Sequence, residues 1–268
     1  MIKRENIKSR MLISIGLTSI ILLLSSLAFA FDHTYSALDQ FLKRHVKDGL
    51  VDYSVIKKSP ADLEKIVHEL EGVTLKEYEI WSNPERMAFW INAYNIGAVK
   101  HVLDNYPLKK SFGLSALRYP ANSIQQIPDV WNKPILNLLG KNVSLNEIEN
   151  ERLRKEFKDP RIHFVIVCAS IGCPVLREEA YSAETLDGQL NEQIKEFANT
   201  PSKFRYDADK DILFLSPIFK WFGEDFDKKG GVISFLKDYV PPDMALKLSN
   251  NTRIEWQDYD WGLNEQER

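Results

Sequence analysis

A histidine and two cysteines lie close together in one short stretch of the chain. His163 precedes Cys168 by five residues, and Cys173 follows in the same segment, which also contains Gly172 and Pro174. These residue types support four kinds of chemistry: zinc coordination, a thiolate nucleophile with a histidine base, a structural disulfide, and a redox-active cysteine pair. A loop that follows a buried element is a common place for such a site.

The spacing disfavours two of these four. Zinc takes four protein ligands in structural sites and three in catalytic sites, whereas H-x4-C-x4-C is not a usual zinc spacing and the sequence has only two cysteines. A redox-active pair usually has the compact C-x-x-C form. The acidic turn from Asp207 to Asp211 also lacks the glycine of a calcium loop, and Ile218 stands where a bidentate glutamate is needed. We therefore expect no metal and no cofactor.

The thiol nucleophile and the disulfide remain as alternatives. The β-branched and aromatic residues of Arg161–Val167 predict a buried strand. Residues five apart on a continuous strand point to opposite faces, so His163 serves Cys168 as a base only if the cysteine lies past the strand end. Export to an oxidising compartment favours a Cys168–Cys173 disulfide, which would contribute roughly 2 kcal/mol by stiffening the turn.

A second set of polar residues lies in a helix that is otherwise apolar. The sequence Ser82-Asn83-Pro84-Glu85 predicts the start of this helix, and Pro107 predicts its end. At about 100° per residue, Glu85, Asn92 and Asn95 share one face. A buried amide without a partner costs about 1–3 kcal/mol, so these groups must be satisfied. They either line a polar pocket or bond to the backbone of a neighbouring loop, and the second interpretation is favoured because most side-chain hydrogen bonds go to backbone or water.

The remaining elements indicate the fold class. Apolar residues at helical spacing predict further helices, and alternation around a polar turn predicts one hairpin. The predicted helices cover Tyr35–His45, Ser59–Gly72, Ser144–Phe157 and Leu186–Phe197; the hairpin joins Phe204–Tyr206 to Ile212–Phe214; two short helices and a strand near Ile254 and Trp256 follow. We predict an α+β fold: a helix-rich single domain with a small mixed or antiparallel sheet.

The first thirty residues have the composition of a signal peptide. Four basic residues precede Met11, no charge occurs from Met11 to Ala30, and the stretch ends in Ala28-Phe29-Ala30. We expect cleavage after Ala30, which leaves residues 31–268 as one globular domain in the periplasm or outside the cell. The alternative is an uncleaved signal that anchors the protein to the inner membrane, since an uncharged run of about twenty residues is long enough to span a bilayer.

The charge balance restricts the possible partners. The chain has 35 Lys+Arg and 38 Asp+Glu, a net charge of -3. Residues 1–30 hold four basic residues and one acidic residue, so residues 31–268 carry 31 basic and 37 acidic residues, a net of -6. This balance argues against binding nucleic acid or anionic lipid through bulk charge. We expect a small molecule or a cell-envelope component as the partner, no nucleic acid, and no stable membrane insertion after cleavage.

Seven segments in order carry a resemblance to a known family. They are Asp48–Tyr53, Ala88–Asn95, Leu145–Arg154, Asp159–Phe164, Cys168–Pro174, Leu215–Trp221 and Tyr259–Trp261. The chain resembles bacterial, exported members of the domain of unknown function 547 family, and so many ordered matches are specific. The resemblance implies a fold and one polar cluster of Asn92, Asn95, Glu149, Arg161 and His163. Asn150 departs from the family, which often has a histidine there, and the two cysteines are not universal in plant-type members.

Two function hypotheses follow. In the first, the protein is a hydrolase or acyl-transferase acting on an envelope component, with His163, Cys168 and Glu149 as catalytic residues. Asn92, Asn95 and Arg161 would then bind the ligand. In the second, the protein is a non-catalytic binding or scaffold module stiffened by a Cys168–Cys173 disulfide. The sequence leaves open whether the protein is an enzyme.

Overall fold

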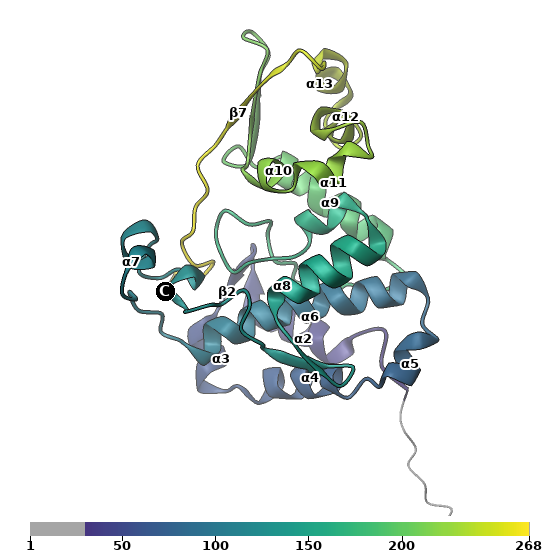
Figure 1. The fold of residues 1–268 in the computed structure, drawn as a ribbon, viewed down its shortest axis with the longest axis vertical. Coiled ribbons are helices and arrows are strands. Elements are labelled where there is room, and N and C mark those ends of the chain that lie inside the picture. Colours follow the sequence, from purple (N-terminus) through teal and green to yellow (C-terminus); the bar gives the residue numbers. More distant parts are fainter. Residues whose placement is uncertain (1–29, 268) are drawn as a thin grey trace, which may run out of the picture. The chain divides into compact units, whose positions relative to one another are not determined.

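The computed structural model describes residues 30–267 (Figure 1). Residues 1–29 hold nearly all of the expected signal peptide and lie outside the described part, so its cleavage stays a prediction. Among residues 30–267, no helix is both long and apolar enough to cross a bilayer.

The N-terminal part consists of short helices and one small hairpin. Both helices expected here are confirmed: α2 has its buried residues on one face, and α4 begins after Pro60 and ends at the capping residue Gly72. The hairpin turns at Asp48-Gly49, where both residues have positive φ. The elements are α2 (Ser36–His45), β1 (Val46–Lys47), β2 (Leu50–Val51), α3 (Tyr53–Lys58), α4 (Ala61–Glu71) and α5 (Leu75–Glu79).

The long helix α6 (Asn83–Asp104) is buried over most of its circumference. Its start lies where the sequence placed it and is a capping box: the Ser82 hydroxyl accepts from the Glu85 amide at 3.4 Å, and the Ser82 amide donates to Glu85 Oε2 at 2.7 Å. Glu85 therefore closes the helix terminus, whereas Asn92 and Asn95 lie deep in the core.

The helix expected over Ser144–Phe157 is present, begins with a capping box and has an unusual form. Ser144 and Glu147 exchange hydrogen bonds at the start of α8 (Leu145–Glu147), which continues directly into η3 (Ile148–Phe157). The turns of η3 are wound in the wider π form. This form is rare in proteins, and where it occurs it is often at a functional site. Preceding elements are α7 (Leu114–Arg118), η2 (Ile124–Gln126) and the hairpin of β3 (Leu136–Leu138) with β4 (Lys141–Val143).

The predicted strand over Arg161–Val167 is wrong. Residues Pro160–Phe164 instead form a short 3-10 helix, η4. The Asp159 side chain accepts from the Arg161 amide at 3.0 Å, and Pro160 occupies the first turn. An acidic cap followed by proline favours a helical turn, and here it overrides the β propensity of the residues that follow.

The C-terminal part contains the three-stranded sheet. The expected hairpin of β5 (Phe204–Asp207) and β6 (Ile212–Leu215) is confirmed, and β7 (Arg253–Trp256) joins β6 in parallel, so the sheet is mixed. The preceding α9 (Leu186–Ala198) is also confirmed. Where two short helices were expected, four follow the hairpin, and they share an aromatic core with η4. They are α10 (Ile218–Trp221), α11 (Gly223–Asp227), α12 (Val232–Leu236) and α13 (Pro242–Lys247).

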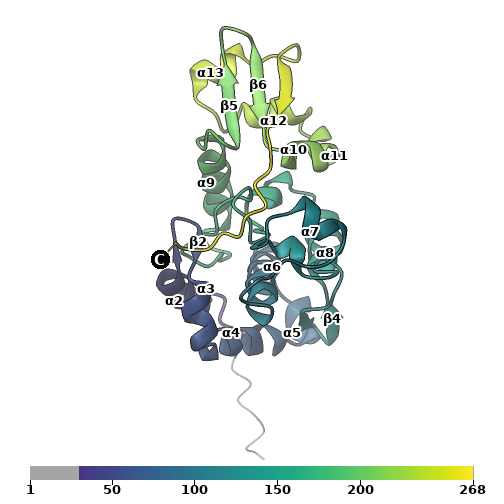
Figure 2. The ribbon, with the colours of Figure 1, turned by 90° about the vertical axis from the view of Figure 1, so that its left-hand side faces the viewer.

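The last described residues return to the N-terminal part of the fold. After β7 the chain runs back from the three-stranded sheet to β2 (Figure 2). Val51 pairs with Glu265 in a parallel bridge, and the Asn264 side chain accepts from the Tyr53 hydroxyl at 2.8 Å. These contacts hold residues 257–266 across the region that contains the cysteine loop. The predicted helix-rich α+β class with small sheets is confirmed.

Candidate functional site

A cavity lies where α6, η3, η4, the cysteine loop and the C-terminal segment meet. It encloses about 570 Å³ of empty space, its open mouth included. Glu149, His163 and Cys168, the three residues predicted as catalytic, all line it. The structure therefore brings together side chains from separate segments at one solvent-reachable site.

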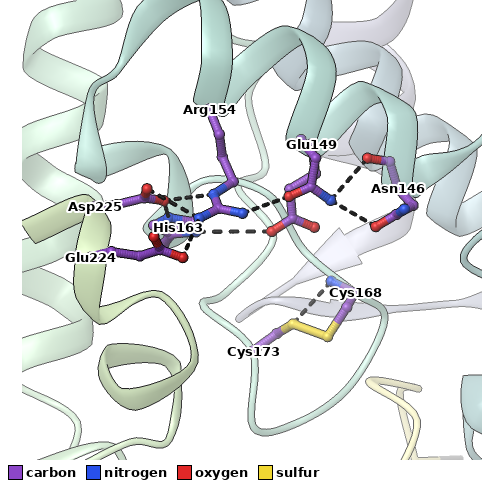
Figure 3. A network of polar contacts seen from close by, with 9 residues as sticks. Asn146, Glu149, Arg154, His163, Cys168, Cys173, Glu224 and Asp225 are labelled. Atoms are coloured by element: carbon purple, nitrogen blue, oxygen red, sulfur yellow. Dashed lines mark hydrogen bonds and ion pairs between the residues drawn. A yellow bond between two sulfur atoms is a disulfide. The ribbon is translucent and has the colours of Figure 1, made fainter.

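His163 is held rigidly in the cavity wall. Its side chain is 1% exposed, its ring stacks on Phe222 with centroids 4.0 Å apart, and its Nε2 lies 2.7 Å from Asp225 Oδ2 (Figure 3). Burial lowers the pKa of His163 even though Asp225 acts in the opposite direction. A neutral ring beside an ionised carboxylate carries its proton on Nε2, so Nδ1 presents a lone pair.

The other ring nitrogen of His163 faces a second carboxyl group. Nδ1 lies 3.9 Å from Glu149 Oε1, and it has no hydrogen-bond partner among the described residues. Buried polar atoms normally have a partner, so an unsatisfied one at a cavity wall marks a position where a ligand or water can bind.

Glu149 is an acid that titrates near neutrality. Burial raises the pKa of Glu149 to about 7; Asp225 adds to this effect, whereas Arg154 and a hydrogen bond with the Tyr94 hydroxyl oppose it. The Glu149 side chain is 15% exposed. At neutral pH both its protonated and its ionised forms are populated, as general acid–base catalysis requires.

Asp225 is the opposite case, a carboxylate held in its ionised form. Burial disfavours the charge, but hydrogen bonds from His163 and Arg154 hold the pKa of Asp225 well below its usual range. Arg154 contacts both carboxylate oxygens, with Nε 2.6 Å from Oδ2 and Nη2 3.1 Å from Oδ1. Two carboxyl groups with pKa values pushed apart are typical of an acid–base site.

Asn150 supports this network from outside the cavity. Its Oδ1 accepts from Arg154 Nη1 at 2.6 Å, and its Nδ2 donates to the Asn146 side chain at 2.7 Å. Asn150 is not among the residues that line the cavity. Its contact orients the guanidinium that binds Asp225.

The two cysteines form a disulfide, as the export argument favoured. Cys168 and Cys173 are bonded, and both line the cavity. The Tyr259 hydroxyl lies 3.1 Å from each sulfur, and Ser170 Oγ lies 3.0 Å from the Cys168 sulfur. In this state Cys168 has no thiolate, so it forms part of the wall rather than a nucleophile. The argument that His163 and Cys168 point to opposite faces of a strand no longer applies, because His163 lies in the 3-10 helix η4.

Asn92 and Asn95 hold loops in place, which confirms the backbone interpretation of the polar helix face. Asn95 donates to the Val165 carbonyl at 2.9 Å and accepts from the Val167 amide at 2.8 Å. Asn92 makes the same pair of bonds to the backbone of Tyr181, at 2.8 and 3.0 Å. Both asparagines border a separate small crevice beside α2 and are not among the cavity-lining residues. Asn95 thus fixes the backbone between His163 and the disulfide.

Arg161 points away from the cavity. Its guanidinium pairs with Asp159 at 2.7 Å and with Asp187 at 2.6 Å, and it donates to Asn191 at 2.9 Å. Through these contacts Arg161 links η4 to α9. Of the six predicted site residues, the structure therefore groups Glu149, His163 and Cys168 at the cavity and places the other three around it.

Several functional side chains were not assigned from the sequence. Asp225 lies outside every segment that carried the resemblance, and only packing brings it to His163. Arg154 is the last residue of Leu145–Arg154, which did carry the resemblance. Trp221, Tyr259 and Trp261 line the cavity and lie in segments that carried the family resemblance, which was a usable signal.

The fold and site define a helix-rich α+β domain with a disulfide-walled, aromatic cavity. Within it, residues 78–198 match the model of the family described as "Protein of unknown function, DUF547", which confirms the resemblance seen in the sequence. The match includes Glu149, His163 and both cysteines but ends before Asp225. Neither the curated proteins nor the solved structures contain a match to this chain.

Proposed function

We propose that the cavity is the acid–base site of an exported hydrolase or acyl-transferase acting on an envelope component. The observation that carries the proposal is the position of His163 Nδ1, which is buried, lacks a hydrogen-bond partner among the described residues and lies 3.9 Å from Glu149 Oε1. A proton acceptor and a group that titrates near neutrality thus meet at one wall of a cavity.

The roles of these residues follow from their protonation. His163 keeps its proton on Nε2, toward Asp225, so its Nδ1 removes a proton from an attacking hydroxyl or water. The imidazolium then gives this proton from Nδ1 to the leaving group, and Glu149, whose Oε1 lies 3.9 Å from Nδ1, orients the attacking group. Asp225 stays ionised, holds the ring orientation and stabilises the imidazolium that forms during the reaction. Arg154 and Asn150 position Asp225 and do not touch the substrate.

The nucleophile in this proposal is water or a substrate hydroxyl. The disulfide leaves no free thiol at the cavity, and within residues 30–267 no lysine or arginine lines it to stabilise a thiolate. A disulfide is also the stable state of two neighbouring cysteines in an oxidising compartment, which fits the expected export.

A binding or scaffold module is the second candidate. It is supported by the disulfide and by the asparagines, whose side chains bond to loop backbone rather than to the cavity. In this case the protein binds a ligand and does not turn it over.

Exposure of purified protein to envelope fractions, followed by mass spectrometry of the products, separates the two candidates. An enzyme releases products that His163→Gln and Glu149→Gln abolish, whereas Glu151→Gln, on the exposed side of η3, is without effect. Binding without product in the wild type supports the module. A wild type that neither binds nor changes any fraction contradicts both.

Export is tested on the same protein. Mass spectrometry of the N-terminus of material from the exported fraction is expected to give Phe31 as the first residue. Retention of residues 1–30 in the membrane fraction would support the anchored alternative, and recovery of the intact chain only from the cytosol would contradict export.

A further inference from the structure

The walls of the cavity are unusually aromatic. Six lining residues carry aromatic rings other than histidine, and they come from four separate parts of the chain: Tyr94, Trp131, Trp221 with Phe222, and Tyr259 with Trp261. Among the described residues that line the cavity, Glu149 is the one carboxyl group, and none is a lysine or an arginine.

Three of these rings form a contiguous cluster. The Tyr259 ring lies 4.9 Å from that of Trp221 and 4.6 Å from that of Trp261, and the two indoles are 6.0 Å apart with an interplanar angle of 28°. The Trp221 side chain remains 47% exposed, so this cluster reaches the solvent. The faces of aromatic rings attract cations, with tryptophan the strongest, and aromatic cages are known to recognise quaternary ammonium groups.

We infer that the cavity binds an organic cation of the quaternary-ammonium class, with its alkyl groups against the aromatic rings and its charge balanced by Glu149. The inference rests on the proposed function, because it names the substrate class of the same cavity. The inference requires a carboxylate in the cavity whose negative charge is not already neutralised by a positively charged group of the protein.

The charges around Glu149 meet this requirement. On its own helix, Arg154 is the cation whose charge favours the ionised form of Glu149, but its guanidinium donates to both oxygens of Asp225 and to Asn150. Asp225 on α11 adds a negative charge, and His163 on η4 is neutral at neutral pH. Tyr94 on α6 and Tyr259 in the C-terminal segment are uncharged, because burial raises the pKa of each. Arg154 and Asp225 therefore compensate each other, and the ionised Glu149 needs a further cation.

A sugar fits the same walls less well. Sugars require many hydrogen-bonding groups, but the polar side-chain atoms here belong to Glu149, His163, the hydroxyls of Tyr94 and Tyr259, and the indole nitrogens of Trp131, Trp221 and Trp261. The Tyr259 hydroxyl is already in contact with Ser170 and the disulfide. The cavity thus offers aromatic surface and one negative charge, which suits an alkylated ammonium group.

The pKa of Glu149 gives this inference a measurable signature. Burial raises the pKa to about 7 in the empty cavity, so a bound cation favours ionisation and releases a proton. Because the ionised fraction rises about tenfold between roughly pH 6 and pH 8, the affinity for a cation rises by up to about tenfold over that range.

The experiment titrates the tryptophan fluorescence with choline and with its neutral carbon isostere, dimethylbutanol. Choline is expected to bind at least about tenfold more tightly than the isostere at pH 8, and the difference shrinks at pH 6. Glu149→Gln removes the pH dependence, and Trp221→Ala weakens choline binding. Matched controls are Glu151→Gln on the same helix and Trp256→Ala, an exposed tryptophan on β7 outside the cavity.

Equal affinity for choline and dimethylbutanol overturns the inference, as does preferential binding of N-acetylglucosamine oligosaccharides. The proposed function is judged separately, by the loss of product in His163→Gln. If that loss occurs while choline fails to bind, the acid–base proposal stands and the cation inference falls. If choline binds with the expected pH dependence and no product forms, the cavity is a cation-binding site and the protein is a binding module.

Discussion

His163 and Asp225 are 62 residues apart in the sequence, and their Nε2 and Oδ2 atoms lie 2.7 Å apart. The contact joins η4 to α11, two short helices that share one aromatic core. Because Arg154 binds both oxygens of the same carboxylate, the direction of the His163 ring is fixed by two independent segments. This relationship leads to the first of four predictions.

Asp225→Asn is expected to destabilise the protein and to change the tautomer of His163. The variant loses two charge-assisted hydrogen bonds, and we expect the free energy of unfolding to fall by about 2 kcal/mol at neutral pH. The amide group that replaces the carboxylate presents a donor to Nε2, so the ring proton moves to Nδ1. Urea unfolding and nitrogen-15 NMR of the imidazole measure the two effects.

The pH dependence of this loss has a defined sign. The folded-state pKa of Asp225 lies below its ordinary value of 3.8, so its stabilisation is complete above that value and is lost as pH falls through the folded pKa. Asp227→Asn, an exposed change on the same helix, should alter stability by less than about 0.5 kcal/mol. Equal stability of Asp225→Asn and Asp227→Asn would refute the assignment.

Glu149→Gln is expected to gain stability relative to the wild type as pH rises. The pKa of Glu149 is about 7 in the folded protein against an ordinary 4.5, so the folded state holds a proton that the unfolded chain releases between these values. The wild type therefore loses stability relative to the variant across this interval, on the order of 3 kcal/mol when Glu149 is fully ionised. Urea unfolding of both proteins from pH 4 to pH 8 tests this, and parallel curves would contradict it.

Removal of the disulfide should weaken the protein without unfolding it. Cys168 and Cys173 are five residues apart, and closing so short a loop contributes roughly 2 kcal/mol in the chain-entropy account. Asn95 and the C-terminal segment still hold the loop, so the double serine variant keeps its fold. The midpoint of thermal unfolding should be the same for the double serine variant and for the reduced wild type. Thiol titration of unreduced, denatured wild type should find no free thiol. Two free thiols in that sample would show that the bond does not form.

Gly172→Ala is expected to displace the C-terminal segment from the cavity. An added Cβ would lie 2.9 Å from both the nitrogen and the oxygen of the Asp260 backbone, closer than real side chains come. The neighbouring Tyr259 and Trp261 should shift, with a loss of about 1–3 kcal/mol. Gly188→Ala in α9 meets no atom within 4 Å and should instead stabilise the helix by about 0.5–1 kcal/mol. Tryptophan fluorescence and urea unfolding compare the two variants. If Gly172→Ala has the fluorescence and the free energy of unfolding of the wild type, the close approach of Gly172 to Asp260 does not position the C-terminal segment.

The sequence predicted the parts of the fold that depend on local signals. The helix starts at Ser82 and Ser144, the glycine after α4 and the β5–β6 hairpin all rest on contacts between residues near in sequence, and each is present. The strand over Arg161–Val167 failed because the Asp159-Pro160 cap outweighed β propensity. The backbone that follows bonds to Asn95, 70 residues earlier in the chain, instead of to a neighbouring strand.

The candidate site was predictable only in part. His163, Glu149 and Cys168 were found by residue type and family resemblance. Asp225 could not be found, because an aspartate in a short polar segment has no distinguishing pattern until the aromatic core of η4 and α11 packs. Asn92 and Asn95 show the converse: their burial was predictable, and the backbone groups that they bind were not.

One wall of the cavity comes from residues near the C-terminus, so this wall is the last part of the cavity to be synthesised. Tyr259 and Trp261 belong to the segment that bonds to Gly172 and Val51, and without them one aromatic wall is missing. A chain still emerging during synthesis or translocation has η4, the cysteine loop and Glu149 long before it has this wall. The cavity therefore cannot reach its final form until these residues have emerged, so an incompletely synthesised chain lacks one of its walls.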